Sequence, residues 1–313
     1  MLDATGRYEG VMLGLAIGDA LGWPVEFLPL DDIRANYGPD GITDLEPSQS
    51  HPAGTFTDDT QMTLAIGRAI LSKGADSEGM FIGEVAREFV AWSRSPENDR
   101  APGSTCMAGC RTLARDPDWS APGHNNSKGC GTAMRSAPIG LAWHGDEERI
   151  TRLASQVSEL THGHRTATAG GVATALLITW ALDEISPEQM LPRLIQHTRP
   201  ISEEFVAKVE QVHTVLDKEP ESAYAVLGEA WTADEAIACA LYAFWRSPRD
   251  YRRTVVTAVN MDGDSDSVGC IAGAISGAFN GVDAIPGDWR ATIEQADYLV
   301  EVARALDDFA SAR

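Results

Sequence analysis

Residues 258–277 read AVNMDGDSDSVGCIAGAISG, and they join an acidic stretch to a helical pattern. Aspartates stand at the alternate positions 262, 264 and 266, and glycines follow at 269, 273 and 277. Four-residue spacing places these glycines one above another on a helix face, where the backbone of a second helix can approach closely. We therefore predict a closely packed helix over 267–280 that holds the acidic residues on a rigid support.

The rest of the chain shows helical spacing of apolar residues, and strand-like alternation is almost absent. Gly14 and Gly18 repeat the glycine spacing, and the apolar run 166–182 is too short and too rich in Gly and Thr for a bilayer span. We predict an all-α fold in which that run is a buried central helix. The predicted helices lie near 8–22, 59–73, 79–94, 103–115, 131–143, 147–160, 166–183, 187–197, 201–216, 221–228, 232–246, 249–258, 267–280 and 288–311.

Length and charge limit the possible organisation and partners. The chain has 313 residues and contains neither a linker-like stretch nor a repeat at solenoid spacing, so we predict a single domain over 1–313. Its 46 acidic and 25 basic side chains give a formal charge of −21, which argues against nucleic acid and anionic membranes as partners. An anionic ligand would need local backbone amides, a few basic groups or metal ions to receive it.

Cysteine usage points to a reducing compartment. The cysteines are odd in number and contain no CxxC pair, which is typical of reduced thiols rather than of a disulfide framework or a zinc site. No signal-peptide pattern follows the first residues. We predict a cytoplasmic protein. Its five cysteines are Cys106, Cys110, Cys130, Cys239 and Cys270.

A second acidic stretch, GTFTDDTQ at 54–61, raises the same question as the first. Two like charges about 4 Å apart repel by roughly 1 kcal/mol in water and about 4 kcal/mol near a protein surface. Turn formation accounts for many Asp-rich stretches, whereas a bound divalent cation would reverse the repulsion. An EF-hand is excluded, because Ser267 and Gly273 stand where such a loop needs its glycine and its bidentate glutamate.

Both acidic stretches come at predicted helix starts. Helix N-termini favour negative charge, so capping accounts for one aspartate in each place. Capping does not account for five acids and two hydroxyls. Oxygen ligands without His or Cys suit Mg²⁺, Mn²⁺ or Ca²⁺ better than zinc.

Five separated motifs resemble those of the ADP-ribosylglycohydrolase family, and they occur in the family's order over nearly the whole chain. The resemblance implies an all-α, orthogonal multi-helix assembly with two divalent cations, Mg²⁺ or Mn²⁺, at the base of a cleft. It also implies an enzyme that removes ADP-ribose from modified side chains. The motifs are GLAIGDALGWPVEF at 14–27, GTFTDDTQM at 54–62, KGCGTAMRSAP at 128–138, LTHGHRTATAG at 160–170 and MDGDSDSVGCIAGAISG at 261–277.

The resemblance assigns metal-binding and catalytic residues. Asp266 would bridge the two cations, whereas Asp262 falls outside the ligand pattern and is expected in a turn or behind the ligands. Glu26 would lie over the scissile bond as the general base, with Asp58 as the metal-linked assistant. The implied metal ligands are Thr57, Asp58, Asp59, Asp264, Asp266 and Ser267.

The resemblance also assigns a substrate-binding set. The loop 127–131 (SKGCG) would hold the diphosphate, and backbone amides at its glycines suit phosphate oxygens. Lys128 would add a local positive charge, and His162 would either contact the ribose or serve as a structural histidine. Arg135 is expected to pair with a nearby carboxylate. The predicted substrate-binding residues are Gly103, Ser127, Lys128, Gly129, Cys130, Gly131, Met134 and His162.

The sequence departs from the family pattern at two positions that bear on the cleaved linkage. Arginine-specific members carry an aspartate at a position that is Ala101 here, in DRAPGST at 99–105, and Cys130 stands where many members have asparagine. An arginine N-glycoside is preferred over a serine O-glycoside or a free ADP-ribose derivative. The partner would be an ADP-ribosylated protein or ADP-ribose, bound by a monomer. Two alternatives stay open: a non-catalytic ADP-ribose-binding or structural homologue, and a metal-dependent nucleotide phosphohydrolase.

Overall fold

The computed structural model describes residues 4–115 and 125–313, and within these ranges it contains sixteen α-helices, four short 3-10 helices and only isolated β-bridges. The predicted all-α fold is confirmed. The helices are α1 (Ala4–Gly22), η1 (Trp23–Val25), α2 (Leu30–Tyr37), α3 (Asp58–Lys73), α4 (Glu78–Trp92), α5 (Ser104–Leu113), η2 (Cys130–Thr132), α6 (Ala137–Ala142), α7 (Glu147–Glu159), α8 (Arg165–Leu182), α9 (Pro187–Thr198), α10 (Glu203–Val209), η3 (Glu210–Thr214), α11 (Pro220–Leu227), α12 (Ala233–Arg246), α13 (Tyr251–Val259), α14 (Ser265–Asn280), η4 (Val282–Ala284), α15 (Gly287–Thr292) and α16 (Ala296–Ser311).

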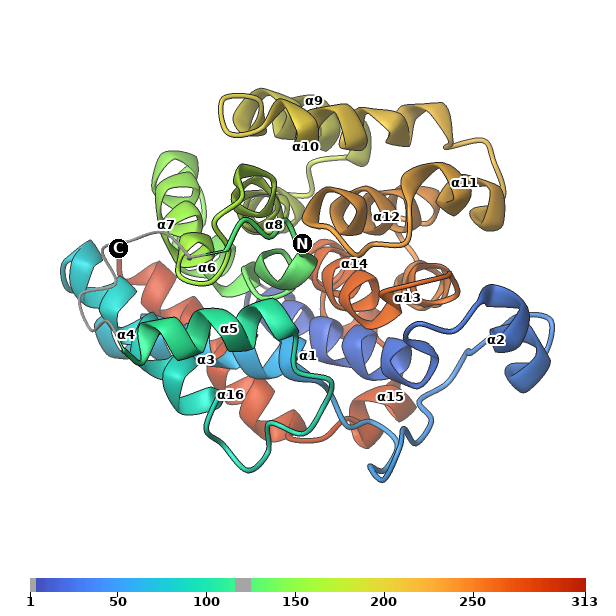
Figure 1. Cartoon of the computed structure of the whole chain (residues 1–313), viewed down its shortest axis with the longest axis horizontal. Helices are drawn as coiled ribbons and strands as arrows, with labels where there is room; N and C mark the ends of the chain where they lie inside the picture. The colour runs from blue at the N-terminus through green and yellow to red at the C-terminus, as the bar shows by residue number, and fades with distance from the viewer. Residues whose placement is uncertain (1–3, 116–124) are drawn as a thin grey trace.

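Helices α1 and α14 pack against each other at the centre of the molecule (Figure 1). A Cβ atom added at Gly14 would lie 2.5 Å from the carbonyl oxygen of Gly273, and one at Gly18 would lie 2.0 Å from that of Gly269. No side chain larger than hydrogen fits such a contact. The two glycine patterns in the sequence are therefore the two sides of one interface.

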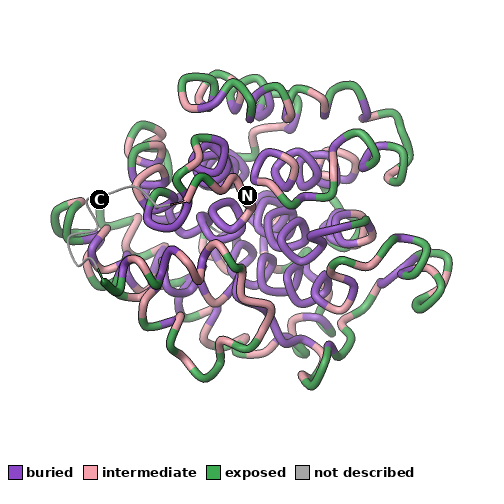
Figure 2. The backbone as a smooth tube through the Cα atoms, in the orientation of Figure 1, coloured by how far each residue is buried: buried purple, intermediate pink, exposed green. Residues whose placement is uncertain are grey.

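Helix α8 is the buried central helix predicted from residues 166–182, and every residue of that run is buried. It contacts α6, α7, α12 and α14. The tube coloured by burial is purple through this central group and green along the outer turns of α9 and α10 (Figure 2). The core thus lies behind the helix starts that carry the acidic residues.

Several predicted helices are shorter than their patterns suggested. The segment 131–143 is a single 3-10 turn followed by α6, which begins next to Pro138, and 201–216 is α10 followed by η3. The segment 288–311 breaks at Gln295, whose φ of 54° is left-handed and ends the regular helix. Helix α2 was missed because it buries only Leu30 and Ile33, and two apolar positions do not define a period.

Among the described residues no single helix is long and apolar enough to cross a membrane. Ala4–Val25 and Leu30–Tyr37 reach that length and composition only when counted together, and they are bent by 94°.

Candidate active site

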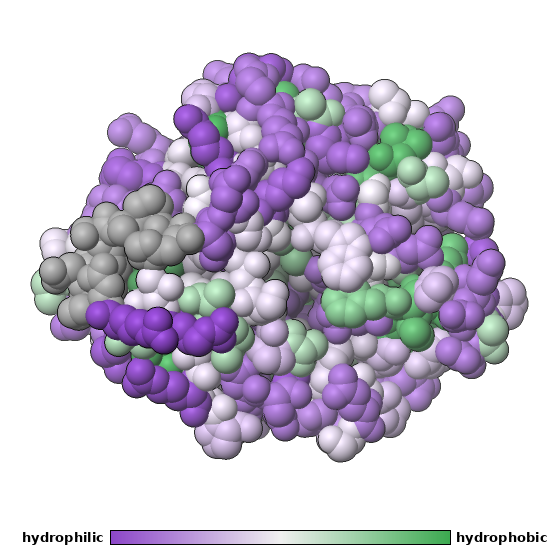
Figure 3. Space-filling model, in the orientation of Figure 1, coloured by the Kyte–Doolittle hydropathy of each residue, from purple (hydrophilic) through white to green (hydrophobic). Residues whose placement is uncertain are grey.

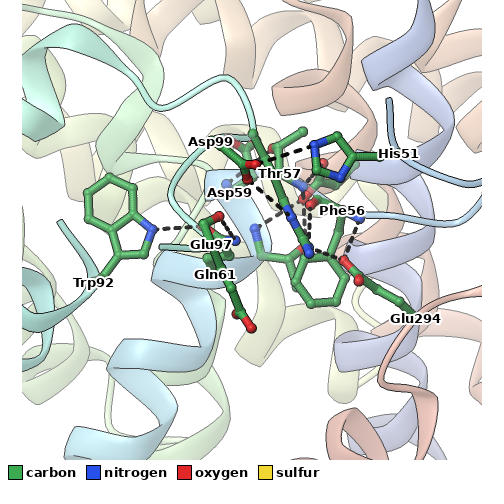
Figure 4. Close-up of polar contacts among 12 residues, drawn as sticks. His51, Phe56, Thr57, Asp59, Gln61, Trp92, Glu97, Asp99 and Glu294 are labelled. Carbon is green, nitrogen blue, oxygen red and sulfur yellow. Dashed lines mark hydrogen bonds and ion pairs between the residues drawn. The ribbon is translucent and has the colours of Figure 1, made fainter. Parts of the chain in front are cut away.

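The start of α3 is held in place from three directions, and Figure 4 shows one of them, the contact of Phe56 with Glu294. On the α1 side, the carboxylate of Asp19 accepts hydrogen bonds from the backbone N–H of Thr57 at 3.0 Å and from the hydroxyl of Thr60 at 2.6 Å. Thr57 itself caps the helix, because its Oγ1 accepts the N–H of Asp59 at 3.3 Å. Asp58 Oδ2 accepts the N–H of Gly103 at 3.0 Å.

The third support comes from an ion pair between Arg100 and Glu294. Glu294 Oε1 accepts the N–H of Phe56 at 3.0 Å, and Arg100 donates to the carbonyl of Phe56 at 3.3 Å. The carbonyl of Arg100 also accepts the N–H of Asp58 at 3.3 Å. The α15–α16 junction and the 99–103 loop thus fix the backbone that carries Asp58 and Asp59.

The start of α14 is packed as tightly as its glycine face. A Cβ atom at Gly22 would lie 2.5 Å from the Cα of Asp266, and the hydroxyl of Ser265 donates to the Gly22 carbonyl at 3.1 Å. The N–H of Asp264 donates to the carbonyl of Glu229 at 2.9 Å. Asp262 lies behind this turn, where its Oδ1 accepts the N–H of Leu30 at 2.6 Å. Asp262 therefore supports the start of α2 and lies outside the pocket lining.

The starts of α3 and α14 line one pocket with a volume of about 470 Å³. The pocket includes most of the predicted site residues, from both acidic stretches and from the glycine loop. The carboxylate oxygens of Glu26, Asp264 and Asp266 lie within 4.8 Å of one another. The predicted site residues that line the pocket are Glu26, Asp58, Asp59, Gly103, Gly129, Cys130, Gly131, Met134, His162, Asp264, Asp266 and Ser267.

Five carboxylates in this lining face no lysine or arginine of the same lining. Burial raises the pKa of Asp58 to about 8, and burial together with the charge of Asp264 raises the pKa of Glu26 to about 9. Burial also raises the pKa values of Asp59 and Asp266 well above the ordinary range, with neighbouring carboxylates adding to the effect. Asp59 Oδ2 is buried and has no hydrogen-bond partner.

This donor set fits a divalent cation. Carboxylate and hydroxyl oxygens are the ligands that hard cations prefer, and a cation would supply the positive charge that the lining lacks. The unpartnered oxygen of Asp59 is the kind of buried polar atom that calls for an ion or a ligand. Glu26, Asp264 and Asp266 lie close enough to one another to share such an ion, and Asp58, Asp59 and Ser267 line the same pocket.

The glycine loop forms another part of the pocket lining. Ser127 Oγ accepts the N–H of Gly129 at 3.2 Å and contacts Thr105 Oγ1 at 3.1 Å, which shapes the turn before η2. Lys128 is not where the sequence analysis expected it: its ammonium pairs with Glu204 at 2.6 Å and does not line the pocket. The expectation that Lys128 brings positive charge to the pocket is therefore wrong for this structure.

A buried hydrogen-bonded row leads to His162. Arg135 Nη2 donates to Thr161 Oγ1 at 2.6 Å, and Thr161 Oγ1 lies 2.8 Å from His162 Nδ1. While it accepts from Arg135, the Thr161 hydroxyl can donate its own proton to Nδ1, and in that arrangement the ring proton sits on Nε2, which faces the Gly129–Gly131 loop. Burial, followed by the charge of Arg135, lowers the pKa of His162 to about 3, so the ring is neutral.

Arg135 corrects a second expectation. No carboxylate among the described residues forms an ion pair with it, and its guanidinium instead lies over the ring of Phe89 at 4.6 Å. It also contacts Cys106 Sγ at 3.5 Å. The residue is fully buried, so its role is to hold Thr161 and the surrounding side chains rather than to neutralise an acid.

Sequence reasoning did not assign several residues that form or support the site, among them Asp19, Phe27 and Trp231. Asp19 holds the start of α3, and the signal for it was a lone acid inside the apolar run of α1. Phe27 and Trp231 stack at the pocket rim with ring centroids 4.7 Å apart and planes 6° apart, and about half of each side chain is exposed. No local pattern marks two aromatic residues that the chain separates so widely.

The space-filling view shows a mainly hydrophilic face with separate hydrophobic patches, in keeping with the acidic composition (Figure 3).

A model of the ADP-ribosylglycohydrolase family matches residues 2–313. An uncharacterized protein of Archaeoglobus fulgidus is 32% identical over 96% of this chain and 95% of its own length. The ADP-ribosyl-[dinitrogen reductase] glycohydrolase of Rhodospirillum rubrum is 28% identical over 92% of this chain and 90% of its own.

A solved structure has the same fold. The ADP-ribosylglycohydrolase-related protein complex superposes with a TM-score of 0.78 at 27% identity, covering 98% of this chain and 99% of that one. The family match extends over the helix starts, the glycine loop and the histidine that form the pocket. This chain belongs to the ADP-ribosylglycohydrolase family.

Proposed function

We propose that this protein is a hydrolase that removes ADP-ribose from modified arginine side chains of proteins and depends on two divalent cations, Mg²⁺ or Mn²⁺. The observation that carries the proposal is the single pocket in which two distant helix starts place Asp58, Asp59, Asp264 and Asp266 without a basic partner. All six ligand residues implied by the family are present, which favours an enzyme over a non-catalytic homologue.

The protein's own side chains divide the work. The aspartates of α3 and α14 and the hydroxyl of Ser267 hold the cations, which when bound orient the ribose hydroxyls and a water and supply positive charge. Neutralising these acids lowers the pKa of Glu26, which then takes a proton from the attacking water. The water oxygen bonds to C1″, the bond from C1″ to the guanidine nitrogen breaks, and Glu26 delivers the proton to that nitrogen.

We assign the rest of the ADP-ribose to the loop of Gly129 and Gly131, which also lines the pocket. The N–H of Gly129 already donates to Ser127 Oγ, so the other backbone amides of this loop would bind the diphosphate oxygens, which a chain with a charge of −21 would otherwise repel. The Nε2 proton of His162 faces the same loop and is placed to donate to a ribose hydroxyl. This neutral donor adds no further charge to the pocket.

The rim supports arginine as the modified residue. Phe27 and Trp231 present stacked, half-exposed rings directly beside Glu26, and Glu229 accepts the Trp231 indole N–H at 2.9 Å. A guanidinium group stacks well on aromatic rings next to carboxylates. Serine offers no cationic group that would stack on such a rim.

We also propose that the protein is cytoplasmic and acts as a monomer. The five free thiols support the cytoplasmic compartment.

The test is incubation with ADP-ribosylated arginine and serine peptides in Mg²⁺, Mn²⁺ or EDTA, followed by mass spectrometry of both products. We expect free ADP-ribose and unmodified arginine peptide with the cations and no product in EDTA, and slower turnover of the serine peptide. Asp262→Asn is the matched control, since Asp262 lies outside the pocket. Release of phosphate instead of ADP-ribose would replace this proposal with a nucleotide phosphohydrolase, and no product from any peptide would contradict it.

A further inference from the structure

Arg135 is a buried cation that makes one short hydrogen bond. Its Nη2 donates to Thr161 Oγ1 at 2.6 Å, and its buried Nε has no hydrogen-bond partner. Its other hydrogen-bond contacts with described residues are 3.4 Å or longer and go to the carbonyl of Val157 and to the sulfur atoms of Cys106 and Met62. A buried charge without a paired charge costs free energy. The short contact therefore identifies Thr161 as the group on which this arginine acts.

Arg135 limits the direction in which the Thr161 hydroxyl can donate. A guanidinium group has hydrogen-bond donors and no acceptor, so Thr161 Oγ1 accepts from it and cannot donate to it. Of the described residues only Arg135 and His162 hydrogen-bond this oxygen, and His162 Nδ1 lies 2.8 Å away. Thr161 is fully buried, so a hydroxyl proton without an acceptor would be costly. The arrangement that satisfies all three side chains has the hydroxyl donating to an unprotonated Nδ1.

The other ring nitrogen of His162 faces the pocket. A Cβ atom added at Gly129 would lie 3.5 Å from Nε2, and one added at Gly131 would lie 3.4 Å from it. His162 is 1% exposed and lines the pocket, and no described residue hydrogen-bonds its Nε2. A ring nitrogen of a buried side chain that faces a pocket without a protein partner indicates a contact with a ligand. Whether Nε2 donates or accepts in that contact depends on the hydrogen bond that Nδ1 makes.

We propose that Arg135 is a positioning residue: through Thr161 it fixes His162 as the tautomer with its proton on Nε2, so that the ring presents a hydrogen-bond donor to an oxygen of the bound ligand. This inference rests on the proposed function for the identity of the ligand, ADP-ribose. An Nε2 atom without a proton would present a lone pair and would repel ligand oxygens. Burial, followed by the charge of Arg135, also lowers the pKa of His162 to about 3, so the ring does not take up a second proton near neutral pH.

The experiment is nitrogen-15 NMR of histidine-labelled protein in Mg²⁺, because the protonated and unprotonated nitrogens of a neutral imidazole give well-separated signals. The signals of His162 are assigned by their loss in His162→Gln. We expect the Nε2–H form in about tenfold excess or more, since the other form leaves a buried hydroxyl proton without an acceptor. Addition of ADP-ribose should move the Nε2 signal and leave Nδ1 unprotonated.

Two variants break the link between Arg135 and His162. Arg135→Met removes the donor that directs the Thr161 hydroxyl, which can then accept from Nδ1 as well as donate to it. We expect both tautomers in comparable amounts, and ADP-ribose binding weakened by about twofold because only one of them is competent. Thr161→Val removes the hydroxyl with Arg135 in place and should also give both forms, which keeps the test decisive if Arg135→Met does not fold.

The matched controls keep the groups that the link requires. Arg135→Lys keeps a cation with donors and no acceptor, and Thr161→Ser keeps the hydroxyl. Both variants should keep the single Nε2–H form.

The outcomes separate this inference from the proposed function. A single Nδ1–H form in the unmodified protein, or a single Nε2–H form that persists in Arg135→Met and in Thr161→Val, overturns the role of Arg135. An unmodified protein that has the Nε2–H form but does not bind ADP-ribose overturns the proposed function and leaves the assignment of Arg135 in place.

Discussion

The two ends of the α1–α14 pair are built on opposite principles. Along the glycine face the contact is uncharged and lies between two regular helices. The backbone of α1 occupies the space that side chains would fill on α14, and the backbone of α14 does the same on α1. At the start of α14, buried carboxylates crowd together, and one of their oxygens has no partner. The difference shows how a protein can hold buried acidic groups in a fixed place. The glycine contact between α1 and α14 is rigid, and it keeps the carboxylates at the start of α14 in position although they repel one another.

The largest effect on stability should come from disrupting the glycine contact between α1 and α14. Gly18→Ala places a Cβ atom 2.0 Å from the Gly269 carbonyl oxygen, so α1 and α14 must separate. We expect the free energy of unfolding to fall by about 3 kcal/mol or more, measured by urea denaturation.

Gly79→Ala is the matched control for that measurement. Gly79 lies in α4 with no neighbouring atom within 4 Å of an added Cβ, so the change should be neutral or stabilising by about 0.5–1 kcal/mol. Equal losses of stability in the two variants would show that the glycine contact does not hold the helices together.

A substitution among the buried carboxylates should change the stability of the metal-free protein in the opposite direction. Asp59→Asn removes a carboxyl group whose ionised form is disfavoured by burial and by the neighbouring carboxylates, so the metal-free protein should gain about 1 kcal/mol of stability while cation affinity falls by about 100-fold or more. Denaturation in EDTA and calorimetry with Mn²⁺ measure the two effects. Asp262→Asn should change neither, because it lies behind the pocket. A destabilised Asp59→Asn protein would mean that this carboxylate is already compensated.

The same crowding predicts a pH dependence for the metal-free protein. The pKa values of Asp58, about 8, and Glu26, about 9, are raised in the folded state, so the folded protein binds more protons than the unfolded chain above the ordinary carboxyl range. Their contribution to stability is therefore greatest at low pH and is lost as the pH rises toward about 9. Denaturation across this range in EDTA should show the slope, Glu26→Gln should reduce it, and saturating Mn²⁺ should flatten it. A slope that Glu26→Gln leaves unchanged would contradict the assignment.

The smallest expected effect concerns the rim. Trp231→Ala removes half of the stacked pair, so KM for an ADP-ribosylated arginine peptide should rise by about fivefold to 30-fold, the range of a cation–π contact. Binding of free ADP-ribose should be unchanged, and Trp231→Phe should restore most of the loss. An equal loss for serine and arginine peptides would remove the rim from the account of specificity.

Local patterns predicted the all-α fold, the buried helix 166–182 and the glycine faces of α1 and α14, because each is a short-range periodicity. The sequence did not say that these two faces meet each other. It placed Arg135 and Lys128 wrongly, because the partner of a charged side chain depends on which distant segments pack beside it. Asp19, Phe27 and Trp231 were missed for the same reason.

Diffraction from crystals soaked in Mn²⁺, with anomalous difference maps, tests the central claim most directly. The account predicts two peaks between the starts of α3 and α14, with Asp59 and Asp266 among their ligands. A pocket without anomalous density in a crystal that binds Mn²⁺ elsewhere would contradict it.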